Sequence, residues 1–282
     1  MSNKITELLN KGLKANHKDK FRQDNVVCLP SHGSVVITGD LHGHRRNFER
    51  IVAFADLEHN QHTHVILQEI IHGGPEDEEG GCLSYKLLFN AIDYKVQFPD
   101  RVHIIMGNHD TAFINNTQVM KNGKEMNVAM RSALDREFVH ASEGIKLAIK
   151  QFLFSQPLAV RCPNGIFISH SLPADRHAAK FDHRILNRQL RINDIVKPGS
   201  AYLLTWGRSH SQPLLDKMAE TLDAKIFVLG HQSQESGCCR AGSNLIILAT
   251  DHNHGCILPI DLAKSYTTDE LLGLIIPVAA IA

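Results

Sequence analysis

Three short apolar segments, separated by helical patterns, constrain the fold of this sequence most strongly. The segments read GSVVITGD (33–40), THVILQEI (63–70) and RVHIIMGNHD (101–110), and each ends in polar residues. A short apolar run without alternation is typical of a strand that is buried on both faces. Residues 44–57 and 84–98, which lie between these segments, carry apolar residues at helical spacing. The order strand, helix, strand, helix, strand predicts a parallel sheet with right-handed crossovers.

The second half of the chain predicts a mixed sheet. PLAVRCPNGIFISHS (157–171) is typical of two strands around a Pro-Asn-Gly turn. A helical pattern at 212–224 and a strand pattern at 225–231 follow. NLIILATD (244–251) and GCILPIDL (255–262) then indicate another strand pair across HNH. We therefore expect an α/β sandwich whose first half is parallel and whose second half is mixed.

The predicted domain organisation is a single domain over 1–282, because no repeat, low-complexity stretch or linker interrupts the chain. Within it, 1–24 is a helical extension with apolar residues along one face, and 111–156 is mostly helical. Residues 263–282 form an apolar tail that is too short for a membrane span. We expect this tail to dock on the core or on a partner, and we expect no membrane association.

Composition narrows the classes of partner. Lys and Arg together number 30, as do Asp and Glu, which gives a formal net charge of +0. A balanced charge argues against a general nucleic-acid binder, so no nucleic-acid partner is expected. The six cysteines include no CxxC spacing that would indicate a zinc knuckle or a redox motif. The sequence starts without a signal-peptide pattern, so we expect a reduced, cytoplasmic setting. The oligomeric state is left open.

Five predicted strand ends carry side chains that can bind metals. These are Asp40 and His42 in GDLHGH, Glu69, Asn108 and His109 in GNHD, His170 in ISHS and His231 in LGHQ. Any one histidine after a strand is more often a hydrogen-bonded loop residue than a ligand. In open α/β sheets, however, ligands bind beyond the carboxyl ends of the strands, where all five would meet. Carboxylates, imidazoles and a carboxamide suit Mn, Fe, Zn or Ni.

Two of these motifs are specific enough to indicate a family. GDLHG (39–43) and GNHD (107–110), followed in order by SHS and GH, resemble the motifs of the calcineurin-like metallophosphoesterases. The most similar branch contains the Ser/Thr protein phosphatases and the bacterial diadenosine tetraphosphatases, and LLTWGR (203–208) is similar to a tryptophan segment of the former. The resemblance covers about 40–255 and implies an α/β fold of two mixed sheets flanked by helices.

The resemblance also implies a centre with two divalent metal ions, of which manganese is expected first and iron, zinc or nickel are alternatives. The implied ligands, with the acid at position 69 bridging the two ions, are Asp40, His42, Glu69, Asn108, His170 and His231. Two such cations clamp a phosphoryl oxygen and lower the pKa of a bound water. His109 would act as the general acid that protonates the leaving alkoxide.

The second family motif, GDxxDRG, aligns with QEIIHGG (68–74) and is largely lost. Glu69 keeps the charge of the bridging Asp and adds one methylene. His72 replaces the Asp that orients the general acid, so the nearby Asp110 is a candidate for this support. Gly73 replaces the Arg that grips phosphate. The candidates for substrate binding are then Arg45, Arg46, Arg208 and, in the DHNHG turn, His252. The first two could equally lie on a solvated helix face, and the alternative for His252 is a surface hairpin turn.

These motifs predict a metal-dependent phosphoesterase that hydrolyses phosphomonoesters, either on a phosphoprotein or in a phosphorylated small molecule such as a nucleotide. The alternative is a catalytically weakened or inactive metal- or phosphate-binding relative, because the second motif is degraded. A site with a single metal ion follows if Glu69 points away from the other ligands.

Overall fold

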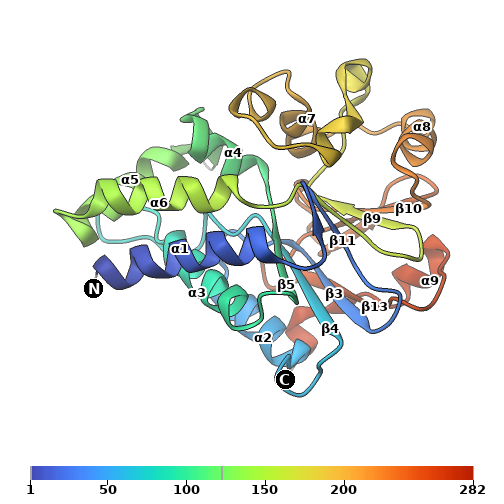
Figure 1. Cartoon of the computed structure of the whole chain (residues 1–282), viewed down its shortest axis with the longest axis horizontal. Coiled ribbons are helices and arrows are strands. Elements are labelled where there is room, and N and C mark those ends of the chain that lie inside the picture. Colours follow the sequence, from blue (N-terminus) through green and yellow to red (C-terminus); the bar gives the residue numbers. More distant parts are fainter. Residues whose placement is uncertain (1, 122, 282) are drawn as a thin grey trace.

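The computed structural model describes residues 2–121 and 123–281, and two packed sheets form its centre (Figure 1). The five-stranded sheet has the order β14-β13-β3-β4-β5. Its strands are β3 (Ser34–Asp40), β4 (Thr63–Gln68), β5 (Val102–Ile105), β13 (Cys256–Asp261) and β14 (Ile276–Pro277). The first three strands are parallel, and β13 and β14 are antiparallel to their neighbours. The predicted parallel first half is therefore confirmed.

The seven-stranded sheet has the order β1-β2-β8-β9-β10-β12-β11. Its strands are β1 (Arg22–Gln23), β2 (Val26–Cys28), β8 (Ala159–Arg161), β9 (Ile166–Ser169), β10 (Ile226–Leu229), β11 (Cys238–Arg240) and β12 (Leu245–Leu248). β8 and β9 form the predicted antiparallel pair around the Pro-Asn-Gly turn, while β9, β10 and β12 are parallel. A small hairpin, β6 (Met120–Lys121) and β7 (Lys124–Glu125), stands apart from both sheets.

Helices cover the outer faces of the two sheets. They are α1 (Ser2–Lys18), α2 (Arg45–Ala55), α3 (Ser84–Gln97), α4 (Asn108–Asn115), α5 (Met126–Phe138), α6 (Ser142–Phe154), α7 (Ser200–Trp206), α8 (Gln212–Leu222) and α9 (Thr268–Leu272). Figure 1 shows α1, α3 and α6 side by side, with α7 and α8 at a distance from them. Short 3-10 turns lie at Asp175–Lys180, His183–Asn187, Ile192–Ile195 and Val278–Ala280. Within the described residues, no helix is long and apolar enough to span a membrane.

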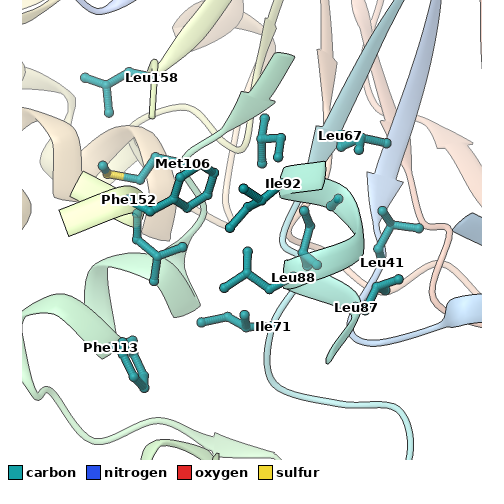
Figure 2. Close-up of a cluster of buried hydrophobic side chains, with 14 of the residues drawn as sticks. Leu41, Leu67, Ile71, Leu87, Leu88, Ile92, Met106, Phe113, Phe152 and Leu158 are labelled. Carbon is teal, nitrogen blue, oxygen red and sulfur yellow. The ribbon is translucent and has the colours of Figure 1, made fainter. Parts of the chain in front are cut away.

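The central strands are buried on both faces, as their unbroken apolar runs predict. In β3, Val35 and Ile37 face the other sheet, whereas Val36 packs toward the helices. β4 alternates in the same way, with Ile66 between the sheets and Leu67 on the helix side. Figure 2 shows the helix-side cluster around Leu67, in which side chains of α3, α4 and α6 meet the sheet. Burial on both faces fixes the register of each strand and therefore the position of its end.

The predicted strand pair at 244–251 and 255–262 is wrong in one respect. Both segments are strands, but β12 belongs to the seven-stranded sheet and β13 pairs with β3 in the other. The chain crosses between the sheets after β12, where Ala249 forms a bridge with Asp40 and the amide of Thr250 donates to the carbonyl of Asp40. Because each strand has two apolar faces, each is better buried at the centre of a sheet than in a shared hairpin.

The two ends of the chain pack on the sheets and helices. The apolar face of α1 lies on α3 and α6, with Leu9 fully buried. The C-terminal segment forms α9 and the strand β14, which pairs with β13 at Cys256 and Ile257. Val278 is buried beyond it. The tail thus docks on the core.

Candidate functional site

Five strand ends from both sheets bring their polar side chains into direct contact. Asp40 ends β3, Glu69 follows β4, Asn108 opens α4 after β5, and His170 and His231 follow β9 and β10. The Nε2 atom of His170 lies 2.9 Å from Asn108 Oδ1 and 3.1 Å from Glu69 Oε2. His231 places its Nδ1 atom 2.9 Å from the same Asn108 oxygen. Its backbone amide donates to Asp40 Oδ1 at 2.8 Å. The structure thus brings the side chains of the predicted strand ends together at the carboxyl edge.

The backbone at this edge is strained at four side-chain-bearing positions. His42, Glu69, His72 and His231 have φ angles of 42°, 45°, 66° and 66°. Such left-handed conformations are uncommon for residues with a side chain and persist only where the surroundings enforce them. Strain of this kind concentrates at functional sites, where it aims a side chain that an ordinary turn would point elsewhere.

Gly107 leaves the space that the longer carboxylate at position 69 needs. A Cβ atom added to Gly107 would lie 2.3 Å from Glu69 Oε2. The amide of His109 donates to the same oxygen at 3.1 Å. Glu69 itself is fully buried, and its other oxygen, Oε1, has no hydrogen-bond partner among the described residues. A buried carboxylate oxygen without a partner is costly unless a cation binds it.

Hydrogen bonds outside the cluster fix the direction of two histidine rings. The amide nitrogen of Gln68 donates to the carbonyl of Thr38 at 2.7 Å, which turns Gln68 Oε1 toward His170 Nδ1 at 3.1 Å. His170 therefore carries its proton on Nδ1 and presents the lone pair of Nε2 to Glu69 and Asn108. His42 is held in the same sense, because its Nδ1 lies 3.0 Å from the carbonyl of Ile71. Partners of this kind commonly orient histidines that bind metals.

Burial shifts the titration of the cluster toward uncharged forms. It raises the pKa of Asp40 to about 6 and that of Glu69 to about 8. It lowers the pKa of His170 to about 4 and that of His42 to about 3. Neutral imidazoles are the form that binds metals, and a bound cation would return the two carboxyls to their charged form.

The donor set fits divalent metal ions, although the side chains lie against one another. In residues 2–121 and 123–281, no group of three or more His, Cys, Asp or Glu side chains is arranged to hold a metal ion as it stands. Ligand-type atoms instead face each other, such as His170 Nε2 and Glu69 Oε2 at 3.1 Å. With the partnerless Glu69 Oε1, this arrangement is one that a cation would stabilise.

His109 contacts His72 and not Asp110. The Nδ1 atoms of His109 and His72 lie 2.9 Å apart, so one must donate and the other accept. The Nε2 atom of buried His72 has no partner among the described residues, which favours a bare nitrogen there and the proton on its Nδ1. His109 then carries its proton on Nε2. Asp110 Oδ2 accepts from the Gly107 amide at 2.9 Å and caps α4.

The predicted substrate-binding residues lie in different places. Arg45 and Arg46 are on the exposed face of α2, where Arg45 donates to Asn90. Arg208 follows α7. Burial is the largest cause that lowers the pKa of His170 and of His231, and the positive charge of Arg208 adds to this effect. His252 is engaged in its own turn, with Nε2 2.8 Å from the carbonyl of Gln234. Their roles in binding substrate stay predictions.

Gln68, His72 and Lys121 belong to the site but are not among the residues expected to act there. Gln68 and His72 stand in the altered second motif, so their positions carried a signal, but their partners His170 and His109 come from distant strands. Lys121 lies in the β6–β7 hairpin and lines a pocket beside His42. Nothing in the sequence around Lys121 indicates that contact.

Comparisons with known proteins identify a family and similar folds. A family model described as calcineurin-like phosphoesterase matches residues 33–244. A protein serine/threonine phosphatase from Saccharomyces cerevisiae has a similar structure, with 13% identity, a TM-score of 0.68, and coverage of 92% of this chain and 82% of that one. A cold-active protein-tyrosine phosphatase of a psychrophilic Shewanella species has 14% identity, a TM-score of 0.58, and coverage of 87% and 80%. None of the curated proteins matches the sequence significantly.

Proposed function

Because this chain belongs to the calcineurin-like phosphoesterase family, we propose that it hydrolyses phosphomonoesters at a centre of two divalent metal ions. Family membership makes it a phosphatase-type hydrolase with the sandwich fold that the motifs imply. The observation that carries the two-metal proposal is the buried Glu69, which lies among ligand-type side chains from both sheets and has one partnerless oxygen.

The proposed roles follow the positions of the side chains. The residues that would hold the metals are Asp40, His42, Glu69, Asn108, His170 and His231. Bound there, two cations would polarise a phosphoryl oxygen and activate a water for attack. Glu69, whose Oε2 lies 3.1 Å from the His170 Nε2 atom that also contacts Asn108, would bridge the ions. Manganese is the metal we expect first.

His109 would protonate the leaving oxygen through Nε2 in the charged form of its ring and would return to the neutral form, with its Nδ1 facing His72. Asp110 would support this role indirectly by fixing the start of α4, which carries His109. Arg208 would help to hold the phosphate, since its charge reaches the cluster from the side of α7. Arg45, Arg46 and His252 would contact only the remoter parts of a substrate.

The proposed substrate is a phosphorylated protein or a phosphorylated small molecule such as a nucleotide. The Saccharomyces neighbour is a protein serine/threonine phosphatase, which supports the former. The six cysteines are free thiols, which supports a reducing, cytoplasmic setting.

Turnover of p-nitrophenyl phosphate by purified protein, loaded in turn with Mn, Fe, Zn and Ni, tests the proposal. We expect hydrolysis with at least one metal and two bound ions per chain. Two bound ions without hydrolysis of this or any phosphomonoester would favour a non-catalytic relative. In His109→Ala, turnover of an alkyl phosphate should fall more than that of p-nitrophenyl phosphate, because an activated phenol leaves without a proton. An equal loss on both substrates would argue against the general-acid role.

A further inference from the structure

Position 73 has no room for a phosphate-gripping side chain in this fold. A Cβ atom added to Gly73 would lie 2.5 Å from the carbonyl oxygen of His42 and 3.0 Å from its Cβ. The neighbouring Gly74 has a φ of +69° and packs equally close to Gly43. The two backbones therefore press against each other beside a candidate metal ligand. A cation for the substrate must come from another element.

A pocket of about 480 Å³ opens next to these glycines. Its walls include His42, Gly73 and Asp251, together with two lysines of the β6–β7 hairpin, Lys121 and Lys124. The hairpin thus carries positive charge to the side of the cluster from which position 73 would have supplied it.

The ammonium groups of the two lysines differ in their hydrogen bonds and ion pairs. Lys124 Nζ lies 2.6 Å from Glu76 Oε2 and donates to the carbonyl of Gly80 at 2.8 Å. Lys121 Nζ lies 3.6 Å from its closest acid, Asp251, which is beyond hydrogen-bond distance. Within the described part of the chain, Lys121 Nζ makes no hydrogen bond. Its three donors are available to an incoming anion, whereas those of Lys124 are engaged.

Lys121 shares this pocket with His42, a candidate metal ligand. An anion that enters the pocket would therefore lie beside both the lysine and the candidate metal centre.

We propose that Lys121 binds the phosphate of the substrate and supplies from the hairpin the charge that Gly73 cannot carry. The inference rests on the proposed function, because it places the phosphate of the substrate between Lys121 and the residues around Glu69. A lysine binds as a mobile point charge, whereas arginine grips two oxygens in a fixed fork. The site should therefore bind phosphate through charge rather than through a strict orientation, with Asp251 releasing Lys121 when the anion arrives.

The test compares Lys121→Met, Lys121→Arg and Lys124→Met. Binding of inorganic phosphate to the metal-loaded proteins is measured by calorimetry, together with metal content, Tm and the KM and kcat for p-nitrophenyl phosphate. Lys121→Met should weaken phosphate binding at least tenfold and raise KM by a similar factor, with metal content and Tm unchanged. Lys121→Arg should stay within threefold of the parent. Lys124→Met, which removes the same charge from the same hairpin, should change phosphate binding by less than threefold.

Phosphate binding by Lys121→Met that equals the parent's, or an equal loss in Lys124→Met, would overturn the inference. A parent protein that binds no phosphate would overturn it as well. If the parent binds phosphate tenfold more tightly than Lys121→Met but hydrolyses no phosphomonoester, the proposed activity fails and the role of Lys121 stands.

Discussion

Glu69 combines three features, each of which alone would lower the stability of the protein. Its side chain is fully buried, its backbone has a φ of 45°, and one of its carboxylate oxygens has no partner among the described residues. The sequence already indicated a buried acid at the end of an apolar strand. It could not indicate that Gly107 would leave room for the extra methylene, because that contact joins two strand ends.

Two replacements of Glu69 should separate the effect of its charge from the effect of its side-chain length. Glu69→Gln keeps the size but removes the charge that would hold two cations together, so we expect the loss of at least one metal per chain and at least a hundredfold loss of activity. Glu69→Asp keeps the charge and should retain metal at least in part. Mass spectrometry of the native proteins gives the stoichiometry. Undiminished metal binding by Glu69→Gln would mean that Glu69 is not a ligand.

A second residue-scale prediction concerns the pair of His72 and His109. The pair shares one proton between two Nδ1 atoms, and burial, reinforced by His42 and His72, holds the pKa of His109 well below its ordinary value. In His72→Asp, a carboxylate would accept from His109 Nδ1 and stabilise the charged ring, so the pKa of His109 should rise. The alkaline limb of kcat should then move to higher pH, by about one unit. If kcat changes in His72→Asp but the alkaline limb of its pH profile stays at the same pH, His72 has a packing role only.

At the scale of elements, the sequence predicts strands and their ends well and their partners less well. The ends of β3, β4 and β5 could be placed together because parallel strands share one carboxyl edge. The crossing from β12 to β13 could not be predicted, since two apolar strands joined by a short polar turn also describe a hairpin. The same holds for Lys121, whose place depends on how the β6–β7 hairpin brings it to the pocket that His42 also lines.

The contact between the two sheets at Gly39 should be sensitive to a single methyl group. A Cβ atom there would lie 2.2 Å from the carbonyl oxygen of Leu248 and 2.6 Å from the amide of Ala249. Because both neighbours are backbone atoms, β3 and β12 would have to separate at the point where they align Asp40. We expect Gly39→Ala to lower the free energy of unfolding by about 3 kcal/mol and to reduce metal binding.

Gly144→Ala provides the matched control for this substitution. Gly144 lies in α6 with no atom within 4 Å of an added Cβ, so the same change should stabilise the protein by up to about 1 kcal/mol. Urea unfolding of both variants measures the difference. Equal stability of the two would show that the sheets tolerate the added methyl group.

At the scale of the whole molecule, a buried polar chain fastens the N-terminal segment to the five-stranded sheet, away from the candidate site. Asp19, just after α1, accepts from Lys95 Nζ at 2.9 Å and lies 2.9 Å from His103 Nδ1. His103 Nε2 in turn lies 3.1 Å from His64 Nδ1. All four side chains are buried. A chain of this kind joins helix α1, helix α3 and strands β4 and β5, and its protonation couples the whole fold to pH.

This buried chain should make the fold sensitive to acid. Burial and the neighbouring His103 lower the pKa of His64 to about 3, whereas an unfolded histidine titrates near about 6.5. Between these values the unfolded state binds more protons, so stability is lost as the pH falls below about 6.5. Although burial acts to raise the pKa of Asp19, His103 and Lys95 hold it well below its ordinary value, so its contribution is lost only below about pH 4.

Urea unfolding between pH 7.5 and 5 tests this coupling in the parent and in His64→Gln. The parent should lose stability as the pH falls, and His64→Gln should show a slope shallower by up to about 1.4 kcal/mol per pH unit, the value of one proton. The change in slope is independent of any stability that the variant loses at pH 7.5 with the hydrogen bond to His103. His140→Gln, at an exposed position, should keep the slope of the parent. Parallel curves for the parent and His64→Gln would mean that His64 takes up its proton without opening the fold, and that the acid sensitivity arises at the histidines of the candidate site.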